Sequence, residues 1–224
     1  MELNTLTAIS PVDGRYRSQV EVLSAYFSEF ALMQYRLRVE TEYFIALSQK
    51  KIFKLSAANA NKLRKIYLDF SPETALEIKN LEKVTNHDVK ALEYYMKKEL
   101  EKLELGDLKE FIHFGLTSQD VNNTAVPMMW KESLENEYLP AISNLSLSLR
   151  KLANSWKNIP MLARTHGQPA SPTNLGKEIM VFVERIDDQL NLLNQVPYSC
   201  KFGGATGNFN AQVRMAFYHF YHFS

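Results

Sequence analysis

Three short polar segments carry most of the side chains that could bind an anion or move a proton. They are Thr85-Asn86-His87-Asp88, Thr117-Ser118-Gln119-Asp120 and Thr165-His166-Gly167-Gln168-Pro169. Each adjoins the expected start of a helix, where free backbone N–H groups and the helix dipole favour bound anions. The segments therefore predict a site for a ligand with several negative charges, and simple helix capping is the alternative explanation.

Two histidines in these segments, His87 and His166, have the chemistry for proton transfer near neutral pH. His166 lies in a proline-rich stretch that can hold an imidazole in a fixed orientation. The alternative for either histidine is a structural or merely exposed side chain. A third, His113, stands among aromatic residues and is expected to pack against them without a carboxylate partner.

Two further pairs of residues could hold a charged ligand. Arg15 and Tyr16 follow a predicted turn and offer a guanidinium and a phenol, which suit a phosphate or a carboxylate; a surface pair is the alternative. His219 and His222 are three residues apart, but no further ligand lies near them in the sequence, so no metal site is predicted there.

The elements that must hold these segments are helices. Apolar residues recur at steps of three, four and seven over 28–49, 87–105, 139–156 and 172–195, as in amphipathic helices. No comparable run alternates with a period of two, and 8 glycines and 8 prolines are few for 224 residues, so no strand is predicted. The fold is therefore predicted to be all-α, with long helices packed as a bundle.

Cap residues predict where the helices begin. The pairs with capping-box spacing are Thr85 with Asp88 and Thr117 with Asp120. Ser171 is a predicted N-cap, with Pro172 as the first helical residue. Pro127 and Pro140 both fall within one helical pattern, over 118–157, and each is predicted to kink or break that helix.

The composition excludes several classes of protein. The net charge is +1, from 26 Lys+Arg against 25 Asp+Glu, so no global basic excess attracts nucleic acid or an anionic membrane. The single cysteine, Cys200, excludes an intramolecular disulfide. No signal peptide is visible, and no apolar run approaches the roughly 20 residues of a membrane span. We expect a cytoplasmic protein with neither a nucleic-acid nor a membrane partner.

The polar segments, taken together, resemble the adenylosuccinate lyase family of the fumarase/aspartase superfamily. The resemblance is collinear and covers about residues 1–212. The matching segments are Ser10-Pro11-Val12-Asp13-Gly14-Arg15-Tyr16, Thr85-Asn86-His87-Asp88-Val89-Lys90, Glu110-Phe111-Ile112-His113-Phe114, Thr117-Ser118-Gln119-Asp120-Val121-Asn122-Asn123, Arg164-Thr165-His166-Gly167-Gln168-Pro169-Ala170 and Gly207-Asn208-Phe209-Asn210-Ala211. The first two point to this family in particular, in its longer bacterial form.

The resemblance implies a β-elimination that cleaves a C–N bond. Such an enzyme releases fumarate from adenylosuccinate, giving AMP, and from the succinylated aminoimidazole carboxamide nucleotide of purine synthesis, with no metal or organic cofactor. His166 matches the general acid, and His87 matches a histidine that orients the substrate or assists His166. The matching substrate-binding positions are Arg15, Tyr16, Asn86, Asp88, Thr117, Ser118 and Gln168. The family forms homotetramers in which three subunits build each active site.

Two departures from the family pattern limit what is expected of this chain. The loop Ser-Ser-x-Met-Pro-x-Lys-x-Asn-Pro, which carries the catalytic base, is absent, and the resemblance ends near Ala211. The resemblance implies an N-terminal helical domain over 1–111, a partial central bundle over 112–212 and an atypical aromatic tail over 213–224. We expect a truncated chain that is inactive alone and associates aberrantly. The alternatives are another superfamily lyase, resembling argininosuccinate lyase, and a non-catalytic helical assembly module.

Overall fold

The structure is a computed structural model, which describes residues 6–213, and the chain divides into two compact units. The first unit holds the described residues up to Trp130 and those from Ser199 onward, and the second is Lys131–Tyr198. Apart from Val213, the predicted aromatic tail with His219 and His222 lies outside the described residues. The expected boundary between residues 111 and 112 refers to the domains of the family fold and stays a prediction.

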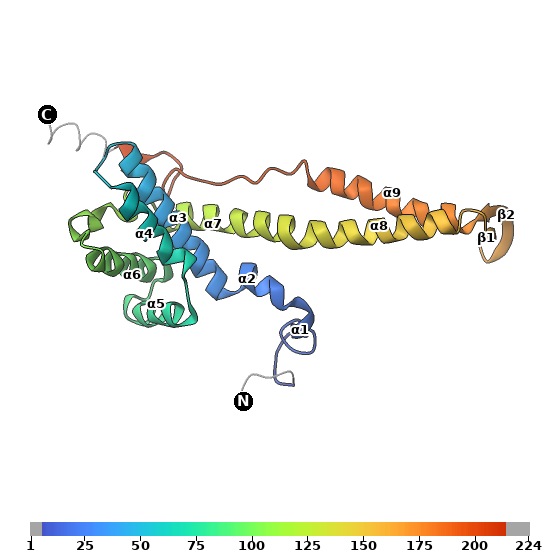
Figure 1. The fold of residues 1–224 in the computed structure, drawn as a ribbon, viewed down its shortest axis with the longest axis horizontal. Coiled ribbons are helices and arrows are strands. Elements are labelled where there is room, and N and C mark those ends of the chain that lie inside the picture. The colour runs from blue at the N-terminus through green and yellow to red at the C-terminus, as the bar shows by residue number, and fades with distance from the viewer. Residues whose placement is uncertain (1–5, 214–224) are drawn as a thin grey trace. The chain divides into compact units, whose positions relative to one another are not determined.

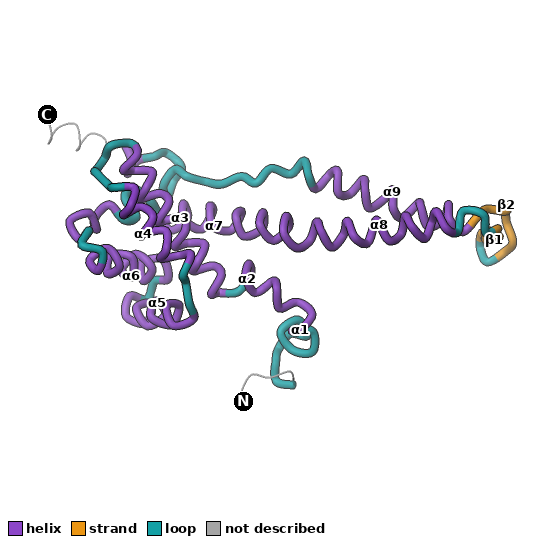
Figure 2. The backbone as a smooth tube through the Cα atoms, viewed as in Figure 1, coloured by secondary structure: helices purple, strands orange, loops and turns teal. Residues whose placement is uncertain are grey.

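Helices make up most of the first unit (Figures 1 and 2). In chain order they are α1 (Arg17–Val20), the short 3-10 turn η1 (Glu21–Leu23), α2 (Ser24–Phe27), α3 (Glu29–Gln49), α4 (Ala57–Leu68), α5 (Pro72–Thr85), α6 (Asp88–Lys102), the 3-10 turn η2 (Gly106–Phe111) and α7 (Ser118–Ser133), whose last residues belong to the second unit. The helices predicted over 28–49 and 87–105 are thereby confirmed as α3 and α6. Within residues 6–213, no helix is both long and apolar enough to cross a membrane.

Two apolar faces make α3 the centre of the first unit. The helix begins at Ser28, whose hydroxyl accepts the N–H of Ala31 at 3.1 Å. The larger buried cluster joins α3 to α4, α5 and α6, and its largest fully buried side chains are Leu37, Phe44, Leu63, Ile78, Leu92, Met96 and Leu100. A smaller cluster joins α3 to α7 through Ala31, Tyr35, Ala125 and Met129. The helix therefore holds α6 and α7, which follow two of the polar segments, on different faces.

The second unit is a helical pair closed by a hairpin. The π-helical turn η3 (Leu134–Tyr138) leads into α8 (Leu139–Ser155), which packs against α9 (Leu175–Leu193). Pro140 lies in the first turn of α8, directly after η3, so the helix passes through a π turn at this proline instead of breaking. Pro127 lies inside α7, which also continues through it. The helices predicted over 139–156 and 172–195 are confirmed, although α9 begins three residues late.

The expectation that the chain contains no strand is wrong between α8 and α9. β1 (Pro160–Thr165) and β2 (Gln168–Asn174) form a two-stranded antiparallel sheet, with an irregularity between Leu162 and Arg164. Ser171 and Pro172 therefore lie in β2 and do not start α9. The N-cap is Asn174, whose side-chain oxygen accepts the N–H of Lys177 at 2.7 Å. Prolines fit this hairpin because both of its strands are edge strands.

Close contact at one glycine joins α8 to α9. A Cβ atom at Gly176 would overlap the carbonyl oxygen of Ala153 and lie 2.6 Å from Cα of Lys157. The start of α9 also donates to the residues that follow α8, from Leu175 N–H to Ile159 O at 3.0 Å and from Gly176 N–H to Trp156 O at 3.2 Å. The base of the hairpin is therefore held by backbone contacts that leave no room for a side chain.

Gly176→Ala should reduce the free energy of unfolding by about 1–3 kcal/mol, because the added methyl group collides with backbone atoms that cannot rotate away. Urea unfolding followed by circular dichroism measures the change. Gly106→Ala is the matched control, since its Cβ would meet only Glu101 Cγ at an ordinary 3.5 Å. Equal stabilities of the two variants would contradict the close approach.

Candidate active site

Two of the three polar segments meet in the first unit. His87 is the N-cap residue of α6, and Ser118 is the first residue of α7. Nε2 of His87 lies 3.4 Å from the hydroxyl oxygen of Ser118, although 31 residues separate them in the chain. The structure thus brings together two of the predicted site residues, at the N-terminal ends of two different helices.

The orientation of His87 follows from its capping role. Its Nδ1 accepts the backbone N–H of Lys90 at 3.3 Å, so in the neutral ring the proton belongs on Nε2. His87 therefore presents an N–H donor toward Ser118. The expected N-cap, Thr85, is instead the last residue of α5, and its hydroxyl donates to the carbonyl oxygen of His87 at 3.1 Å. An imidazole here takes the place of the expected threonine hydroxyl.

A single left-handed residue separates α5 from the N-cap of α6. Asn86 has φ +52°, a conformation that asparagine adopts more readily than most residues, and its N–H closes α5 by donating to Glu82 O at 2.8 Å. Asp88 follows His87 as the first residue of α6, and its Oδ1 accepts the N–H of Val89 at 2.8 Å. Burial raises the pKa of Asp88, but this backbone hydrogen bond and the charge of Arg36 outweigh it, so the pKa is lowered.

A cavity of about 370 Å³ adjoins this helix junction. Its polar lining includes Arg36 from α3 and the predicted site residues Asn86, His87 and Asp88. The His87 imidazole is about half exposed, so a bound molecule can reach it. The cavity therefore offers a space where these side chains could contact one ligand.

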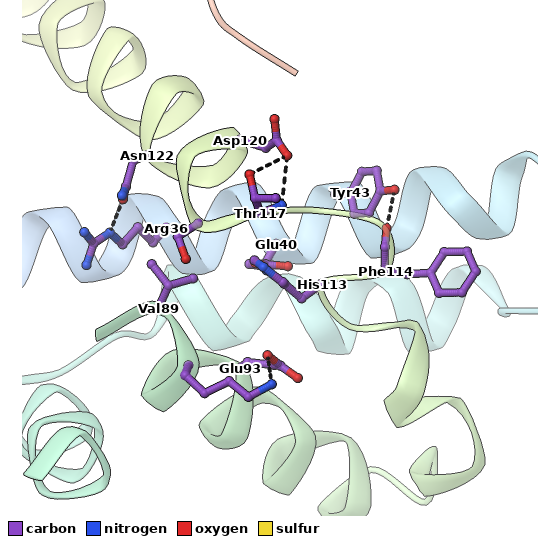
Figure 3. A network of polar contacts seen from close by, with 12 residues as sticks. Arg36, Glu40, Tyr43, Val89, Glu93, His113, Phe114, Thr117, Asp120 and Asn122 are labelled. Carbon is purple, nitrogen blue, oxygen red and sulfur yellow. Dashed lines mark hydrogen bonds and ion pairs between the residues drawn. The ribbon is translucent and has the colours of Figure 1, made fainter. Parts of the chain in front are cut away.

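Asp120 holds the start of α7 in place. Its Oδ2 accepts both the N–H of Thr117 at 2.8 Å and the Thr117 hydroxyl at 3.0 Å, which Figure 3 shows. Its Oδ1 accepts the ammonium of Lys201 at 2.9 Å and the N–H of Gly203 at 2.9 Å, and Gly204 N–H donates to both oxygens. Thr117 and Ser118 are therefore fixed by a carboxylate that also binds the segment from Lys201 to Gly204.

The charge of Asp120 survives burial because so many donors surround it. The residue is 1% exposed. Burial raises the pKa of Asp120, but hydrogen bonds from Gly203, Lys201 and Thr117 prevail and hold it well below its usual range. Asp120 is consequently ionised at neutral pH and supplies a permanent acceptor for the groups it binds.

His113 does not pack among aromatic side chains alone, as the sequence suggested, but pairs with a buried carboxylate. Its Nδ1 lies 2.5 Å from Oε1 of Glu40, which is 1% exposed on α3. Burial lowers the pKa of His113, but the hydrogen bond and charge of Glu40 prevail and raise it above the ordinary 6.5. Next to this pair, the Tyr43 hydroxyl donates to Phe114 O at 2.7 Å (Figure 3). Burial raises the pKa of Tyr43 to about 12, so the phenol stays a neutral donor.

Arg15 and Tyr16 are not among the residues gathered around His87. They follow a turn in which Gly14 N–H donates to Ser10 O at 3.0 Å, and the Arg15 guanidinium carbon lies 5.0 Å from the centre of the Tyr16 ring. The helix that comes next, α1, lies apart from α6 in Figure 1. The pair forms an exposed cation–π contact at the beginning of the chain.

His166 and Gln168 belong to the second unit and form the tip of its hairpin. His166 and Gly167 are the two residues between β1 and β2, with φ angles of +50° and +77°. Positive φ at both positions is what a two-residue type I′ turn requires. His166 is exposed and sits in a left-handed conformation that is uncommon for a histidine. The turn thus exposes the imidazole at the tip of the hairpin.

Several residues of this arrangement were not predicted from the sequence. Arg36, Glu40 and Tyr43 follow one another on α3 at steps of four and three, so polar groups at helical spacing within an apolar helix are the signal that could have found them. Lys201 carries no such signal, because 81 residues separate it from Asp120. Within residues 6–213, no group of three or more His, Cys, Asp and Glu side chains could hold a metal ion.

Replacing Asp120 by asparagine should lower the free energy of unfolding by about 2–4 kcal/mol. Lys201 loses its ionic partner, and the NH2 group that replaces one carboxylate oxygen faces N–H donors from which it cannot accept. Chemical denaturation at neutral pH measures the effect. Asp107→Asn, at an exposed carboxylate, should change stability by less than about 0.5 kcal/mol. An Asp120→Asn variant as stable as this control would show that the cluster is not structural.

Stability should also depend on pH through His113. Its pKa is raised on folding, so its ion pair with Glu40 contributes fully below the unfolded pKa of about 6.5 and is lost as the pH rises through the folded pKa. His113→Asn, which tolerates the φ of +56°, should lose this part of the pH dependence. Urea unfolding of both proteins between about pH 6 and pH 9 tests this. Parallel curves for the two would refute the ion pair.

Comparison with known proteins shows which proteins the chain is similar to. The sequence model of the family described as "Lyase" matches residues 14–220. The chain is 56% identical over 220 residues to adenylosuccinate lyase of Dictyostelium discoideum, covering 94% of this chain and 47% of the relative. It is 41% identical over 218 residues to adenylosuccinate lyase of Escherichia coli K12, covering 95% of this chain and 48% of the relative. The chain thus spans about half the length of the curated relatives it matches.

Solved structures share the fold at low sequence identity. Fumarate lyase from Mesorhizobium sp. BNC1 aligns with a TM-score of 0.71 and 20% identity, over 85% of this chain and 44% of that one. The β-carboxy-cis,cis-muconate cycloisomerase of Acinetobacter calcoaceticus aligns with a TM-score of 0.71 and 19% identity, over 91% of this chain and 48% of that one. The predicted mostly helical fold is thereby confirmed. With the family model matching nearly the whole sequence, this chain belongs to the lyase family.

Proposed function

We propose that this chain contributes part of the active site of an adenylosuccinate lyase. The observation that carries the proposal is the meeting of His87 with Ser118 at two helix starts, in a chain 56% identical to a lyase of that name. Both helix ends offer N–H groups, hydroxyls or an imidazole N–H to an anion. Such donors suit the two carboxylates and the phosphate of adenylosuccinate.

The proposed reaction is a β-elimination with separate acid and base. A base removes the proton from the carbon next to a carboxylate, a carbon–carbon double bond forms, and the C–N bond breaks with its electron pair going to nitrogen. His166 acts as the general acid that protonates this nitrogen, so that fumarate and AMP are released. The base belongs to a family loop that this sequence does not contain. In this proposal the chain is therefore inactive alone.

The remaining predicted residues have binding roles in this proposal. His87, through its Nε2 proton, and Ser118 donate to anionic oxygens of the substrate, and Thr117 with Asn86 and Asp88 completes the set around them. Gln168 contacts the substrate beside His166. Arg15 and Tyr16 lie apart from His87 within the chain, which supports their contribution to the active site of another subunit in a proposed homotetramer.

The proposal includes the substrate and the place of the reaction. The nucleotide is adenylosuccinate or the succinylated aminoimidazole carboxamide nucleotide, both intermediates of purine synthesis, and no metal or organic cofactor takes part. The proposed location is the cytoplasm, where such nucleotides are made.

A complementation assay tests this function. The chain is combined with the part of the Dictyostelium relative that it does not span, adenylosuccinate is added, and the ultraviolet absorbance change is followed. We expect turnover only from the combination. His166→Asn keeps the left-handed turn and removes the acid, so it should reduce kcat by about 10²–10⁴-fold.

Ser171→Ala, on the exposed surface of the same hairpin, is the matched control and should retain full activity. Turnover that His166→Asn leaves unchanged would remove His166 from the mechanism. Nucleotide binding without turnover would indicate a chain that has lost catalysis, and no nucleotide binding at all would favour a helical assembly module.

A further inference from the structure

One arginine joins the two helix starts that carry His87 and Ser118. Arg36 lies in the middle of α3 with its side chain only 10% exposed. Its Nη2 lies 2.8 Å from Oδ2 of Asp88, the first residue of α6, and its Nε donates to Oδ1 of Asn122, in the second turn of α7, at 2.8 Å. Figure 3 shows the contact with Asn122. A single guanidinium thus holds α6 and α7 to α3.

We propose that Arg36 is a positioning residue, which fixes the His87 imidazole in its Nε2–H form and directs it toward Ser118. Its catalytic relevance rests on the proposed lyase function, but its effect on the ring does not. The predicted contacts of the substrate do not include Arg36, so it acts only through the residues that it holds.

The path from Arg36 to the imidazole is short. Asp88 is fixed on one oxygen by Arg36 and on the other by the N–H of Val89 at 2.8 Å. That second oxygen, Oδ1, is engaged by Val89 and lies 3.5 Å from Nδ1 of His87, too far for a good hydrogen bond, so it leaves Nδ1 free to accept the N–H of Lys90. The same Nδ1 accepts the N–H of Lys90, so the ring stays capped only while the first turn of α6 keeps its place.

The α7 side of the site depends on the same guanidinium. Asn122 lies one helical turn after Ser118, so the residue that Arg36 binds and the residue that His87 faces belong to neighbouring turns of one helix. We therefore expect both contacts of Arg36, together with the apolar clusters, to maintain the separation of 3.4 Å between His87 and Ser118. A side chain with one donor direction could hold one helix but not both.

The charge and shape of arginine explain why this residue stands here. A cation near the N-terminal ends of two helices is opposed by both helix dipoles, and a buried cation needs a counter-charge. Asp88 supplies that charge. Guanidinium has several donors in a rigid plane, so it can bind Asp88 and Asn122 in different directions at once, whereas lysine presents one compact ammonium.

Nuclear magnetic resonance of the full chain tests the proposal without any ligand. Two-bond ¹H–¹⁵N correlations of the imidazole rings report which nitrogen carries the proton, and His87→Gln assigns the His87 signals. In the unchanged chain we expect a protonated Nε2 and an acceptor Nδ1. In Arg36→Met the His87 signals should move to the averaged positions of a ring that exchanges between both tautomers, and the Lys90 amide should exchange roughly fivefold faster, the factor for loss of one helix cap.

Two variants serve as controls. One keeps the positive charge at position 36, and the other removes an arginine away from His87. Arg36→Lys keeps the charge but reaches only one partner, so we expect the same change as in Arg36→Met at smaller amplitude. Arg64→Met is the matched control, because Arg64 makes a comparable pair of bonds to Glu42, at 2.7 and 2.9 Å, away from His87. Arg64→Met should leave the His87 signals where they are.

A folded Arg36→Met with unchanged His87 signals and unchanged Lys90 exchange would overturn the proposal, as would an equal shift in Arg64→Met. If Arg36→Met does not fold, Asp88→Asn and Asn122→Ala remove its partners one at a time. Each variant should move the His87 signals toward the averaged positions of the two tautomers. Unchanged His87 signals in both variants would overturn the proposal.

The same measurements separate this proposal from the proposed function. Shifted His87 signals in Arg36→Met, together with no turnover by the complemented unchanged chain, would support Arg36 as a positioning residue and reject the lyase reaction. Turnover by the complemented unchanged chain, together with unchanged His87 signals in Arg36→Met, would support the lyase reaction and reject Arg36 as a positioning residue.

Discussion

Polar side chains buried on α3 are the constraint on which the first unit depends. Arg36 and Glu40 are buried and Tyr43 is half-buried, so each needs a partner inside the protein. All three find their partners in segments that lead into or begin other helices: Asp88 and Asn122, His113, and the carbonyl of Phe114. The apolar faces give α3 its neighbours, and the polar stripe determines how those neighbours are placed along it. The junction of His87 and Ser118 lies beside two of these partners, Asp88 and Asn122.

The strongest sequence signals were local ones, and they succeeded where local physics decides the structure. Apolar spacing located α3, α6, α8 and α9, because an amphipathic stripe reveals which side of a helix is buried. Spacing between Thr117 and Asp120 correctly indicated a contact at the start of α7. The same rule failed at Thr85, because α5 continues through that residue and a left-handed Asn86 shifts the cap by two positions. Capping patterns show that a helix starts nearby, whereas the exact cap depends on how the preceding element ends.

What could not be predicted depends on contacts between distant parts of the chain. Nothing near Arg36 in the sequence indicates Asp88 or Asn122, and nothing near His113 indicates Glu40, which is 73 residues away. The hairpin was missed for a different reason. Its strands are short, rich in proline and exposed, so they lack the alternating apolar pattern by which a half-buried strand is recognised. The sequence signal for this hairpin is in its two-residue turn at His166 and Gly167, where a glycine occupies a position with positive φ.

The first unit is interrupted by the second, and this has a consequence for biosynthesis. Asp120 and its partner Lys201 are 81 residues apart, with the whole of α8, the hairpin and α9 between them. At about 5–20 residues per second, the ribosome adds Lys201 roughly 4–16 s after Asp120. During that interval the carboxylate at the start of α7 has neither the ammonium of Lys201 nor the N–H groups of Gly203 and Gly204 that later surround it. These contacts of the first unit therefore form only after the second unit has been translated. A nascent chain stalled within the hairpin would have the start of α7 without them.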